Sequence, residues 1–283
     1  MIPAFVNPRA GNADAARRAL QKVGGFDIRD VAPATLSDHV KTAIAIGEQR
    51  VLVAGGDGSI GSAAAALAGT GIELAILPCG TLNHLARDLS LPLDLEEAAT
   101  VAKTGTSVLV DAAVVNDRIF LNTSSVGAYV TFVRARERLE RRVGYHIASL
   151  VAAARLIAHM PSFRVTLEVD GGTRRYITPL VFIGVGEREL RLPALGSRVP
   201  HGRSGLHVMV VRRRSGARAL ALGLAAAARG VGAVSKTPAL DAFLVDACRI
   251  ERRPRTVSLD GEIVQVTPPL NYRHVPGHLR VVV

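Results

Sequence analysis

Short apolar segments and helix-forming segments alternate along the first 115 residues, and this alternation is the strongest constraint on the fold. Apolar segments that predict strands lie at 3–7, 50–54, 72–77 and 107–115. Helical patterns occupy 14–23, 37–47, 60–67, 81–89 and 95–103. Strands that alternate with helices are typical of a mostly parallel sheet. We therefore expect a parallel-sheet α/β domain at the front of the chain.

The pattern changes in the second half of the chain. Residues 133–159 contain one long helical pattern, and an Ala-rich stretch at 218–234 predicts a further helix. After Pro161 the segments are short, rich in β-forming residues and separated by Gly and Pro. The expected fold class is therefore α/β plus β, with an α/β domain at 1–122 and a C-terminal antiparallel β-sandwich domain at 123–283. A return of the final strand to the first domain is kept open.

Two glycine turns each follow a predicted strand and precede a predicted helix. The first is Gly55-Gly56-Asp57-Gly58-Ser59 and the second is Pro78-Cys79-Gly80-Thr81, with no P-loop lysine in either. Glycine permits close approach of a phosphate to backbone N–H groups, and the following helix offers its positive end. Either turn alone could be an ordinary connection, with Thr81 as a helix cap. Together, at the carboxyl ends of parallel strands, they favour a nucleotide-binding domain.

Three carboxylates are candidates for chemistry at such a site. Asp57 cannot contact a phosphate directly, but it can hold a Mg²⁺ ion that bridges phosphates, or it can take a proton. Asp260 and Glu262 lie in the segment TVSLDGEIVQV, where Asp-Gly also predicts a plain β-hairpin turn. A turn and a catalytic role for this pair are compatible.

Four segments in order carry a resemblance to a known family. NPRAG at 7–11, GGDGS at 55–59, LPCGTLNHLARDL at 77–89 and LDGE at 259–262 resemble the diacylglycerol kinase catalytic-domain family, which includes bacterial soluble lipid kinases related to sphingosine and ceramide kinases. The segment 110–127 is similar to the family's link into its second domain. GGDG alone is shared with NAD kinases and 6-phosphofructokinases, whereas Leu-Pro-x-Gly-Thr-x-Asn-x-x-Ala-Arg points to lipid kinases.

The resemblance implies an enzyme that uses ATP and Mg²⁺ to phosphorylate a lipid hydroxyl, with diacylglycerol as the expected substrate and phosphatidic acid as the product. It implies that the β-sandwich holds the lipid and that the DGE triplet supplies the proton acceptor. The family pattern leans towards Glu262 as the base, with Asp260 orienting it or contacting the metal, and Asp57 would hold Mg²⁺ through ATP. The implied nucleotide-binding residues are Asn7, Pro8, Arg9, Gly11, Thr35, Gly55, Gly56, Asp57, Gly58, Ser59, Ser62, Gly80, Thr81 and Asn83.

The chain departs from the family pattern at three places. Ser59 replaces the usual Thr but keeps a hydroxyl, and Gly61-Ser62 replaces a frequent Asn-Glu pair that contacts the nucleotide. Many bacterial members carry an Asp-Gly pair before a strand like GLHVMVV, and that Asp helps to bind a structural Mg²⁺. Here Ser204 stands at that position, so this metal site is not expected.

The net charge of +11 is distributed unevenly along the chain. Residues 1–115 contain 9 Lys and Arg against 12 Asp and Glu, whereas residues 116–283 contain 26 against 12, which gives net charges of −3 and +14. Contact with an anionic membrane surface explains this asymmetry, and so does a uniformly solvated basic surface. The candidate patches are Arg134, Arg136, Arg138, Arg141 and Arg142, and Arg212–Arg214.

The aromatic content, the apolar stretches and the cysteines indicate which classes of protein are disfavoured. Aromatic residues make up 4% of the chain, which disfavours a nucleic-acid reader that stacks bases. The start of the chain lacks a signal-peptide pattern, and the longest strongly apolar stretch, 219–228, is too short to span a bilayer. Two cysteines, Cys79 and Cys248, fit a reduced cytosolic setting. We expect a cytoplasmic, peripherally membrane-associated kinase. An NAD kinase-like enzyme, a catalytically weak nucleotide-binding protein and a homodimer stay open.

Overall fold

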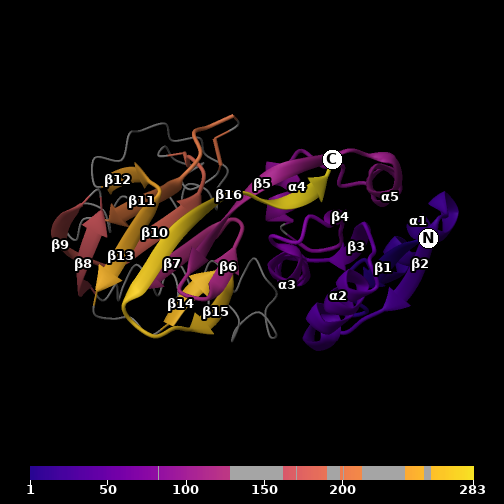
Figure 1. Ribbon diagram of the computed structural model, residues 1–283, viewed down its shortest axis with the longest axis horizontal. Helices are drawn as coiled ribbons and strands as arrows, with labels where there is room; N and C mark the ends of the chain where they lie inside the picture. Colours follow the sequence, from indigo (N-terminus) through magenta and orange to yellow (C-terminus); the bar gives the residue numbers. More distant parts are fainter. Residues whose placement is uncertain are drawn as a thin grey trace, which may run out of the picture. The chain divides into compact units, whose positions relative to one another are not determined.

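The computed structural model describes residues 1–81, 83–127, 162–169, 171–189, 198–199, 201–211, 240–251 and 256–283. The chain forms two compact units, which Figure 1 shows in sequence colours. Unit 1 contains Met1–Ala112, Ile119–Asn122 and Val275–Val283, and unit 2 contains Ala113–Arg118 and Thr123–His274. The expected boundary at residue 122 differs from this division at Ala113–Arg118 and at the last nine residues.

Unit 1 is built on a parallel sheet with the strand order β2-β1-β3-β4-β16. Every neighbouring pair in this series is parallel. The antiparallel pairs of unit 2 use the earlier part of β16. The strands are β1 (Ile2–Val6), β2 (Phe26–Asp30), β3 (Arg50–Gly55), β4 (Glu73–Pro78) and β16 (Leu270–Val282), and β5 (Ser107–Val115) pairs with β16 and with β6 (Arg118–Phe120). Strand β2 was not expected, because FDIRD carries only two apolar residues.

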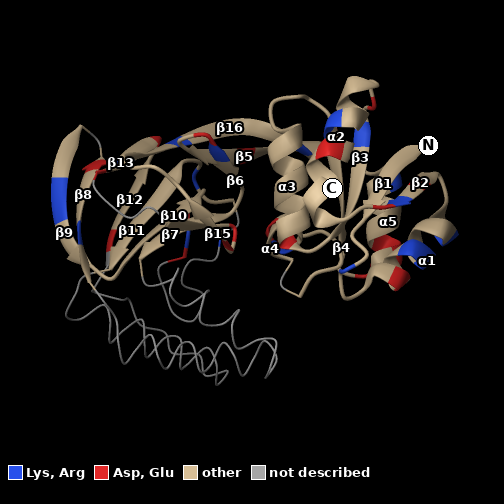
Figure 2. Cartoon of the chain, turned by 90° about the horizontal axis from the view of Figure 1, so that it is seen from below, with Lys and Arg blue, Asp and Glu red and all other residues tan. Residues whose placement is uncertain are grey.

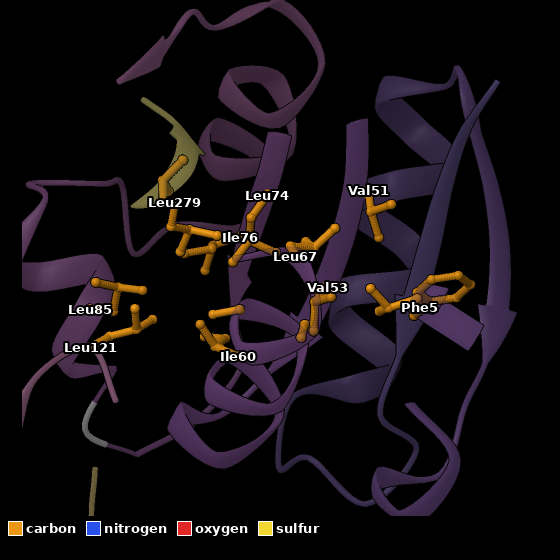
Figure 3. Close-up of a cluster of buried hydrophobic side chains, with 14 of the residues drawn as sticks. Phe5, Val51, Val53, Ile60, Leu67, Leu74, Ile76, Leu85, Leu121 and Leu279 are labelled. Carbon is orange, nitrogen blue, oxygen red and sulfur yellow. The ribbon is translucent and has the colours of Figure 1, made fainter. Parts of the chain in front are cut away.

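Helices cover both faces of this sheet because successive strand residues point to opposite sides. Phe5, Val53 and Ile76 pack with α2 and α3 on one face, and Figure 3 shows this cluster. Val6, Ala54 and Leu77 pack with α1 and α5 on the other face. The helices are α1 (Ala13–Val23), α2 (Leu36–Ala45), α3 (Asp57–Leu67), α4 (His84–Asp88) and α5 (Leu95–Thr104), with a 3₁₀ turn, η1, at Pro33–Thr35. The α/β expectation is confirmed.

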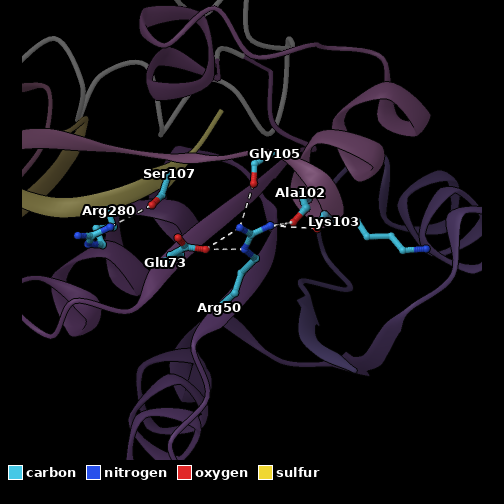
Figure 4. Close-up of polar contacts among 7 residues, drawn as sticks. All are labelled: Arg50, Glu73, Ala102, Lys103, Gly105, Ser107 and Arg280. Atoms are coloured by element: carbon cyan, nitrogen blue, oxygen red, sulfur yellow. Dashed lines mark hydrogen bonds and ion pairs between the residues drawn. The ribbon is translucent and has the colours of Figure 1, made fainter.

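Hydrogen bonds of Arg50 connect the last turn of α5 and the segment between α5 and β5 to the amino ends of β3 and β4 (Figure 4). Arg50 Nε donates to Glu73 Oε2 over 2.7 Å, and the guanidinium also donates to the carbonyl oxygens of Ala102, Lys103 and Gly105 at 2.9 to 3.1 Å. Burial raises the pKa of Glu73, but hydrogen bonds from Ser107 and Arg50, with the charges of Arg50 and Arg280, outweigh burial and hold that pKa below its usual value. This network stabilises the sheet edge opposite the glycine turns.

Unit 2 is a sandwich of two antiparallel sheets. One has the order β12-β11-β10-β7-β14-β15, and the other continues from β16 through β13 and β8 to β9. The strands are β7 (Thr123–Gly127), β8 (Phe163–Val169), β9 (Gly172–Thr178), β10 (Leu180–Val185), β11 (Leu206–Val211), β12 (Leu240–Val245), β13 (Ala247–Glu251), β14 (Thr256–Leu259) and β15 (Glu262–Gln265). Strands β7 and β13 were not expected. The β-sandwich expectation is confirmed.

Two contacts join the two sheets, one between buried side chains and one that involves an exposed arginine. The Ser124 hydroxyl on β7 lies 3.0 Å from the Tyr272 hydroxyl on β16, and both side chains are buried. The Arg174 guanidinium on β9 lies 4.5 Å from the centre of the Phe243 ring on β12. In the described part of the chain, β9 lies at the end of its sheet, and it carries the exposed Arg174 and Arg175. Figure 2 shows Lys or Arg colouring on β8 and β9. Such charges oppose edge-to-edge pairing with other chains.

Several sequence expectations lie outside the described residues. They are the helices at 133–159 and 218–234, the patch from Arg134 to Arg142 and the patch Arg212–Arg214. Within the described part of the chain, no helix is long and apolar enough to cross a membrane.

Candidate active site

Three loops at the carboxyl edge of the parallel sheet contact one another. They follow β1, β3 and β4, which are neighbours in the sheet and run in the same direction. The Asn7 N–H donates to the Ala54 carbonyl, and the Cys79 N–H donates to the Gly55 carbonyl. The loops therefore continue the sheet's hydrogen bonding beyond the strands. This edge is where open α/β sheets bind their ligands.

The first glycine turn is shorter than the sequence indicated. Strand β3 ends at Gly55 and α3 begins at Asp57, so Gly56 is the only residue between them. Asp57, Gly58 and Ser59 form the first turn of the helix, where backbone N–H groups have no partner within the helix. Ser59 packs so closely on Gly55 that a Cβ at Gly55 would lie 2.6 Å from the Ser59 Cβ. The turn therefore requires glycine at position 55.

Asn7 connects the loop after β1 to this helix. Its Nδ2 donates to the Ser59 Oγ over 3.0 Å, and its Oδ1 accepts from the Arg9 N–H over 2.9 Å. Ser59 is buried and Asn7 is half-buried. Both were predicted to touch the nucleotide, and the structure gives them a further task, which is to hold the two loops together. No spacing rule in the sequence predicts a contact between residues 52 positions apart.

The second glycine turn is closed by Asn83. Its Oδ1 accepts from the Gly80 N–H over 2.9 Å, and its Nδ2 donates to the Gly80 carbonyl over 2.8 Å. Asn83 is buried, and its φ of 50° lies in the left-handed region that Asn tolerates. Helix α4 begins only at His84, with Asn83 as its N-cap residue. The expectation of a helix beginning at Thr81, with Thr81 as its cap, is therefore wrong, because Asn83 ends the turn.

Backbone contact joins the two glycine turns. A Cβ at Gly80 would lie 2.6 Å from the Gly56 Cα, and a Cβ at Gly56 would lie 3.3 Å from the Gly80 Cα. Real Cβ atoms do not approach other atoms as closely as 2.6 Å. The two glycines are thus explained by the close approach of the two chain segments to each other. This packing brings the first turn of α3 beside the Gly80 loop.

Asp57 connects the same two turns through its side chain. The His84 N–H, at the start of α4, donates to Asp57 Oδ1 over 2.7 Å. The carboxylate thereby caps α4 from a residue 27 positions away. Among the described residues, Oδ2 of Asp57 accepts no hydrogen bond, so this atom could still contact a cation. The sequence indicated the charge of Asp57 but not its bond to His84.

The other predicted nucleotide-binding residues of unit 1 surround these loops. Pro8, Arg9, Gly11, Thr35 and Thr81 are exposed, and Ser62 is half-buried in α3. The Thr35 hydroxyl donates to the Ala32 carbonyl over 3.2 Å and thus closes the loop before α2. Thr35 follows β2, so it lies at the same carboxyl edge as the glycine turns. An exposed edge with these side chains is accessible to a ligand.

Asp260 and Glu262 lie in unit 2, at the tip of the hairpin of β14 and β15. Leu259 pairs with Glu262, and the two residues between them, Asp260 and Gly261, have φ of 47° and 92°. Positive φ at both positions is the mark of a type I′ turn, so the predicted Asp-Gly hairpin is confirmed. Asp260 Oδ1 accepts from the Thr123 N–H over 2.8 Å, and the Asp260 N–H donates to the Thr123 carbonyl. Glu262 is exposed.

The surroundings of Ser204 do not fit the structural Mg²⁺ of the family. Ser204 Oγ lies 3.3 Å from His274 Nε2, and the nearby Glu187 carboxylate binds the Arg203 guanidinium and backbone N–H. Arg203 holds the pKa of Glu187 below its usual value. In the described ranges no group of three His, Cys, Asp or Glu side chains could hold a metal ion. The ion pair between Glu187 and Arg203 joins the segment after β10 to the segment before β11.

The cysteines are buried free thiols. Burial raises the pKa of Cys79 to about 11 and that of Cys248 to about 12. Both thiols therefore stay protonated near neutral pH, and a thiol is a weak nucleophile. Cys79 belongs to the second glycine turn by position, and it packs in the apolar core with α1 and α5.

Comparison with known proteins identifies the segment that carries the glycine turns. Residues 2–115 match the diacylglycerol kinase catalytic domain. A protein named "Probable lipid kinase YegS-like" from Cronobacter sakazakii is 38% identical over 112 residues, which cover 38% of each chain. A protein named "Diacylglycerol kinase" from Mycobacterium tuberculosis H37Rv is 29% identical over 202 residues, which cover 65% of this chain and 64% of that one. The chain thus spans less than two thirds of these relatives.

The fold likeness extends beyond the diacylglycerol kinase catalytic domain. A crystal structure of a diacylglycerol kinase from Bacillus anthracis matches with a TM-score of 0.69 and 21% identity, and it covers 99% of this chain and 96% of that one. The β-sandwich is therefore part of the shared fold. The family resemblance seen in the sequence is confirmed for the kinase catalytic segment, which contains both glycine turns.

Proposed function

We propose that the chain is an ATP-dependent lipid kinase that transfers the γ-phosphoryl group of ATP to a lipid hydroxyl, with diacylglycerol as the substrate and phosphatidic acid as the product. The observation that carries the proposal is the contact between the glycine turns at Gly56 and Gly80, inside the segment that matches the diacylglycerol kinase catalytic domain. Relatives named as lipid kinase and as diacylglycerol kinase support the choice of acceptor.

The chain's own groups suit the binding of a polyphosphate. The first turn of α3 carries backbone N–H groups that can donate to an anion, and the dipole of this eleven-residue helix favours negative charge at that end. Oδ2 of Asp57 would hold a Mg²⁺ ion carried by the nucleotide. That ion would neutralise phosphate charge. Thr35, Ser62 and Thr81 would contact the rest of ATP.

Glu262 suits the role of general base in the transfer. It is exposed at the start of β15, whereas Asp260 is bound to Thr123 and shapes the turn. A carboxylate that accepts the proton of a hydroxyl makes the oxygen a better nucleophile as it attacks phosphorus. Asp260 would then fix the position of Glu262 by holding the hairpin tip against β7.

The basic charge of residues 116–283 supports a peripheral contact with an anionic membrane surface. Their net charge of +14 attracts such a surface within about 8 Å at physiological ionic strength. Binding to liposomes should require anionic lipid and weaken as salt increases. Equal binding to neutral and anionic liposomes would leave a solvated basic surface as the explanation.

A panel assay tests the proposed activity. Labelled ATP is incubated with the protein and, separately, with diacylglycerol, sphingoid bases, ceramide, NAD and sugars. Transfer to diacylglycerol supports the proposal, and transfer to another lipid would keep the lipid kinase but change the substrate. Transfer to NAD alone would favour the NAD kinase-like alternative.

A further inference from the structure

Two arginines lie opposite each other in the segment that follows β10. Arg188 and Arg198 form an isolated antiparallel bridge. The Val199 N–H donates to the Glu187 carbonyl over 2.9 Å, so the two arginines form a non-hydrogen-bonded pair, the kind in which opposite side chains lie closer together. Like charges directly opposite each other destabilise such a pair. A negative group held between the two arginines would remove this cost.

Both guanidinium groups converge on one carbonyl oxygen. Arg188 Nη2 donates to the Val185 carbonyl over 2.7 Å, and Arg198 Nη2 donates to the same oxygen over 3.2 Å. The two nitrogens therefore lie no more than about 6 Å apart, a distance at which like charges repel. Arg188 is buried and Arg198 is half-buried, so solvent screens this repulsion less than it would at the surface. The partial negative charge of one carbonyl oxygen offsets only part of it.

Two glycines make room for the arginine side chains. A Cβ at Gly184 would lie 2.5 Å from Cγ and Nε of Arg188, and a Cβ at Gly186 would lie 3.4 Å from Nε of Arg198. The backbone of Arg188 is also fixed, because its N–H donates to Nδ1 of the buried His207 over 2.8 Å. Burial lowers the pKa of His207, so its ring is neutral near pH 7. The arginines are thus held in place before any ligand binds, which reduces the entropy cost of binding.

The acidic residues of this segment lie away from the arginine pair. Successive residues of extended backbone point to opposite sides, so Glu187 and Glu189 face away from the side chain of Arg188. The Glu187 carboxylate binds the Arg203 guanidinium and backbone N–H. The sequence from 190 to 205 contains no Asp or Glu. The segment therefore supplies an excess of positive charge on the side of the bridge where the two arginines lie.

We propose that Arg188 and Arg198 form a binding site for a phosphate-class oxyanion. A guanidinium is a planar fork of N–H donors that matches two oxygens of a phosphate group. Inorganic phosphate and the phosphodiester of a phospholipid headgroup offer the same oxygens. The site lies at the end of β10, which β7 separates from β14 in the sheet. It is therefore distinct from the DGE turn, and the inference does not depend on the proposed kinase activity.

Equilibrium dialysis with ³²P-orthophosphate tests the site on the full chain. A saturating non-hydrolysable ATP analogue is present, so that phosphate binding at the glycine turns does not contribute. We expect saturable binding to the wild type and at least tenfold weaker binding to Arg198→Gln. Arg175→Gln removes one exposed arginine of β9 and is the control for net charge. Its affinity for orthophosphate should stay within twofold of the wild type.

Thermal unfolding and vesicle binding provide two further measurements. In chloride, the Tm of Arg198→Gln should equal or exceed that of the wild type, because the repulsion is removed. Phosphate at equal ionic strength should raise the Tm of the wild type and of Arg175→Gln but not that of Arg198→Gln, because a ligand stabilises the state that binds it. Vesicles of phosphatidylglycerol, compared with phosphatidylcholine, identify the source of the oxyanion. Vesicle binding that Arg198→Gln loses, without orthophosphate binding by the wild type, assigns the site to a phospholipid headgroup.

Two results would overturn the inference. One is that Arg198→Gln binds both orthophosphate and phosphatidylglycerol vesicles as the wild type does, including the case in which neither protein binds them. The other is a lower Tm of Arg198→Gln in chloride, which indicates that the arginine pair stabilises the protein without an anion. None of these measurements requires phosphoryl transfer, so a wild type that phosphorylates no lipid would overturn the proposed function alone.

Discussion

Gly80 lies against Gly56 so closely that a Cβ at Gly80 would approach the Gly56 Cα to 2.6 Å. These residues follow neighbouring strands, β3 and β4. Position 80 leaves no room for a Cβ, whereas a Cβ at position 56 would lie 3.3 Å from the Gly80 Cα and would need a small shift of that loop. From the sequence alone, both glycines are explained by the close approach of a phosphate to the backbone. The structure shows that the glycines are also needed for the two loops to pack on each other. Only when the loops are packed can their backbone N–H groups bind one ligand.

Gly80→Ala should separate the two turns and weaken ATP binding more than tenfold, which corresponds to about 1.4 kcal/mol. Gly61→Ala in α3 is the matched control, because a Cβ there meets nothing within 4 Å. This control should stabilise the helix by about 0.5–1 kcal/mol, since glycine is unfavourable within helices. Calorimetry measures the ATP affinity of each folded variant. A folded Gly80→Ala protein with wild-type ATP affinity would contradict the packing argument.

Asp57 variants should separate its structural role from its charge. Asp57→Asn keeps an Oδ1 acceptor for the His84 N–H, so the Tm should change little while the affinity for Mg²⁺-ATP and the turnover fall at least tenfold. Asp57→Ala also removes the cap of α4, which costs about 1 kcal/mol of stability. Thermal unfolding and ATP titration with and without Mg²⁺ measure both effects. Unchanged Mg²⁺-ATP affinity in Asp57→Asn would remove Asp57 from the metal site.

Glu262→Gln should lower kcat by about 10²–10⁴, the usual contribution of a general base, and leave ATP affinity within a few-fold. Asp260→Asn is the companion variant, because Asn keeps the acceptor for Thr123 and tolerates the left-handed φ of position 260. A large loss of kcat in Asp260→Asn would therefore be chemical. Near-normal kcat in both variants would reduce the DGE triplet to a hairpin turn and direct the search for the base to Asp57.

The Arg50 network should make stability depend on acid pH. The pKa of Glu73 is lower in the folded protein than its ordinary value of 4.5, so its contribution is present above that value and is lost as pH falls through the folded-state pKa. Glu73→Gln should flatten this part of the profile of unfolding free energy against pH. An equal acid dependence in wild type and Glu73→Gln would rule out Glu73 as its source.

Removing the guanidinium tests the same network at neutral pH. Arg50→Met should destabilise the protein by about 1–3 kcal/mol, because it leaves a partly buried carboxylate and three carbonyl oxygens without their donor. Lys22→Met, which breaks the exposed pair with Glu96, should change stability by less than about 0.5 kcal/mol. Chemical denaturation measures both values.

The sequence predicted the parts of the fold that depend on local pattern. Apolar strands such as 50–54 and the order of glycine turns fix an α/β domain, and the Asp-Gly step at 260–261 predicts its hairpin. It did not predict β2, because FDIRD is polar and its pairing with β1 depends on tertiary packing. Nor did it predict where α4 begins, because the left-handed Asn83 ends the turn there. The contacts of Asn7 with Ser59 and of Asp57 with His84 join residues far apart in the chain, which no local pattern specifies.

The central claim is that the paired glycine turns serve phosphoryl transfer from ATP to a lipid. The most direct test incubates γ-³²P-ATP and dioctanoylglycerol in mixed micelles with the wild type, Gly61→Ala and Gly80→Ala. We predict a labelled phosphatidic acid product from the wild type and Gly61→Ala, and at most a tenth of that rate from a folded Gly80→Ala protein. No transfer of label to any lipid by the wild type, with ATP and Mg²⁺ at saturating concentration, would contradict the claim.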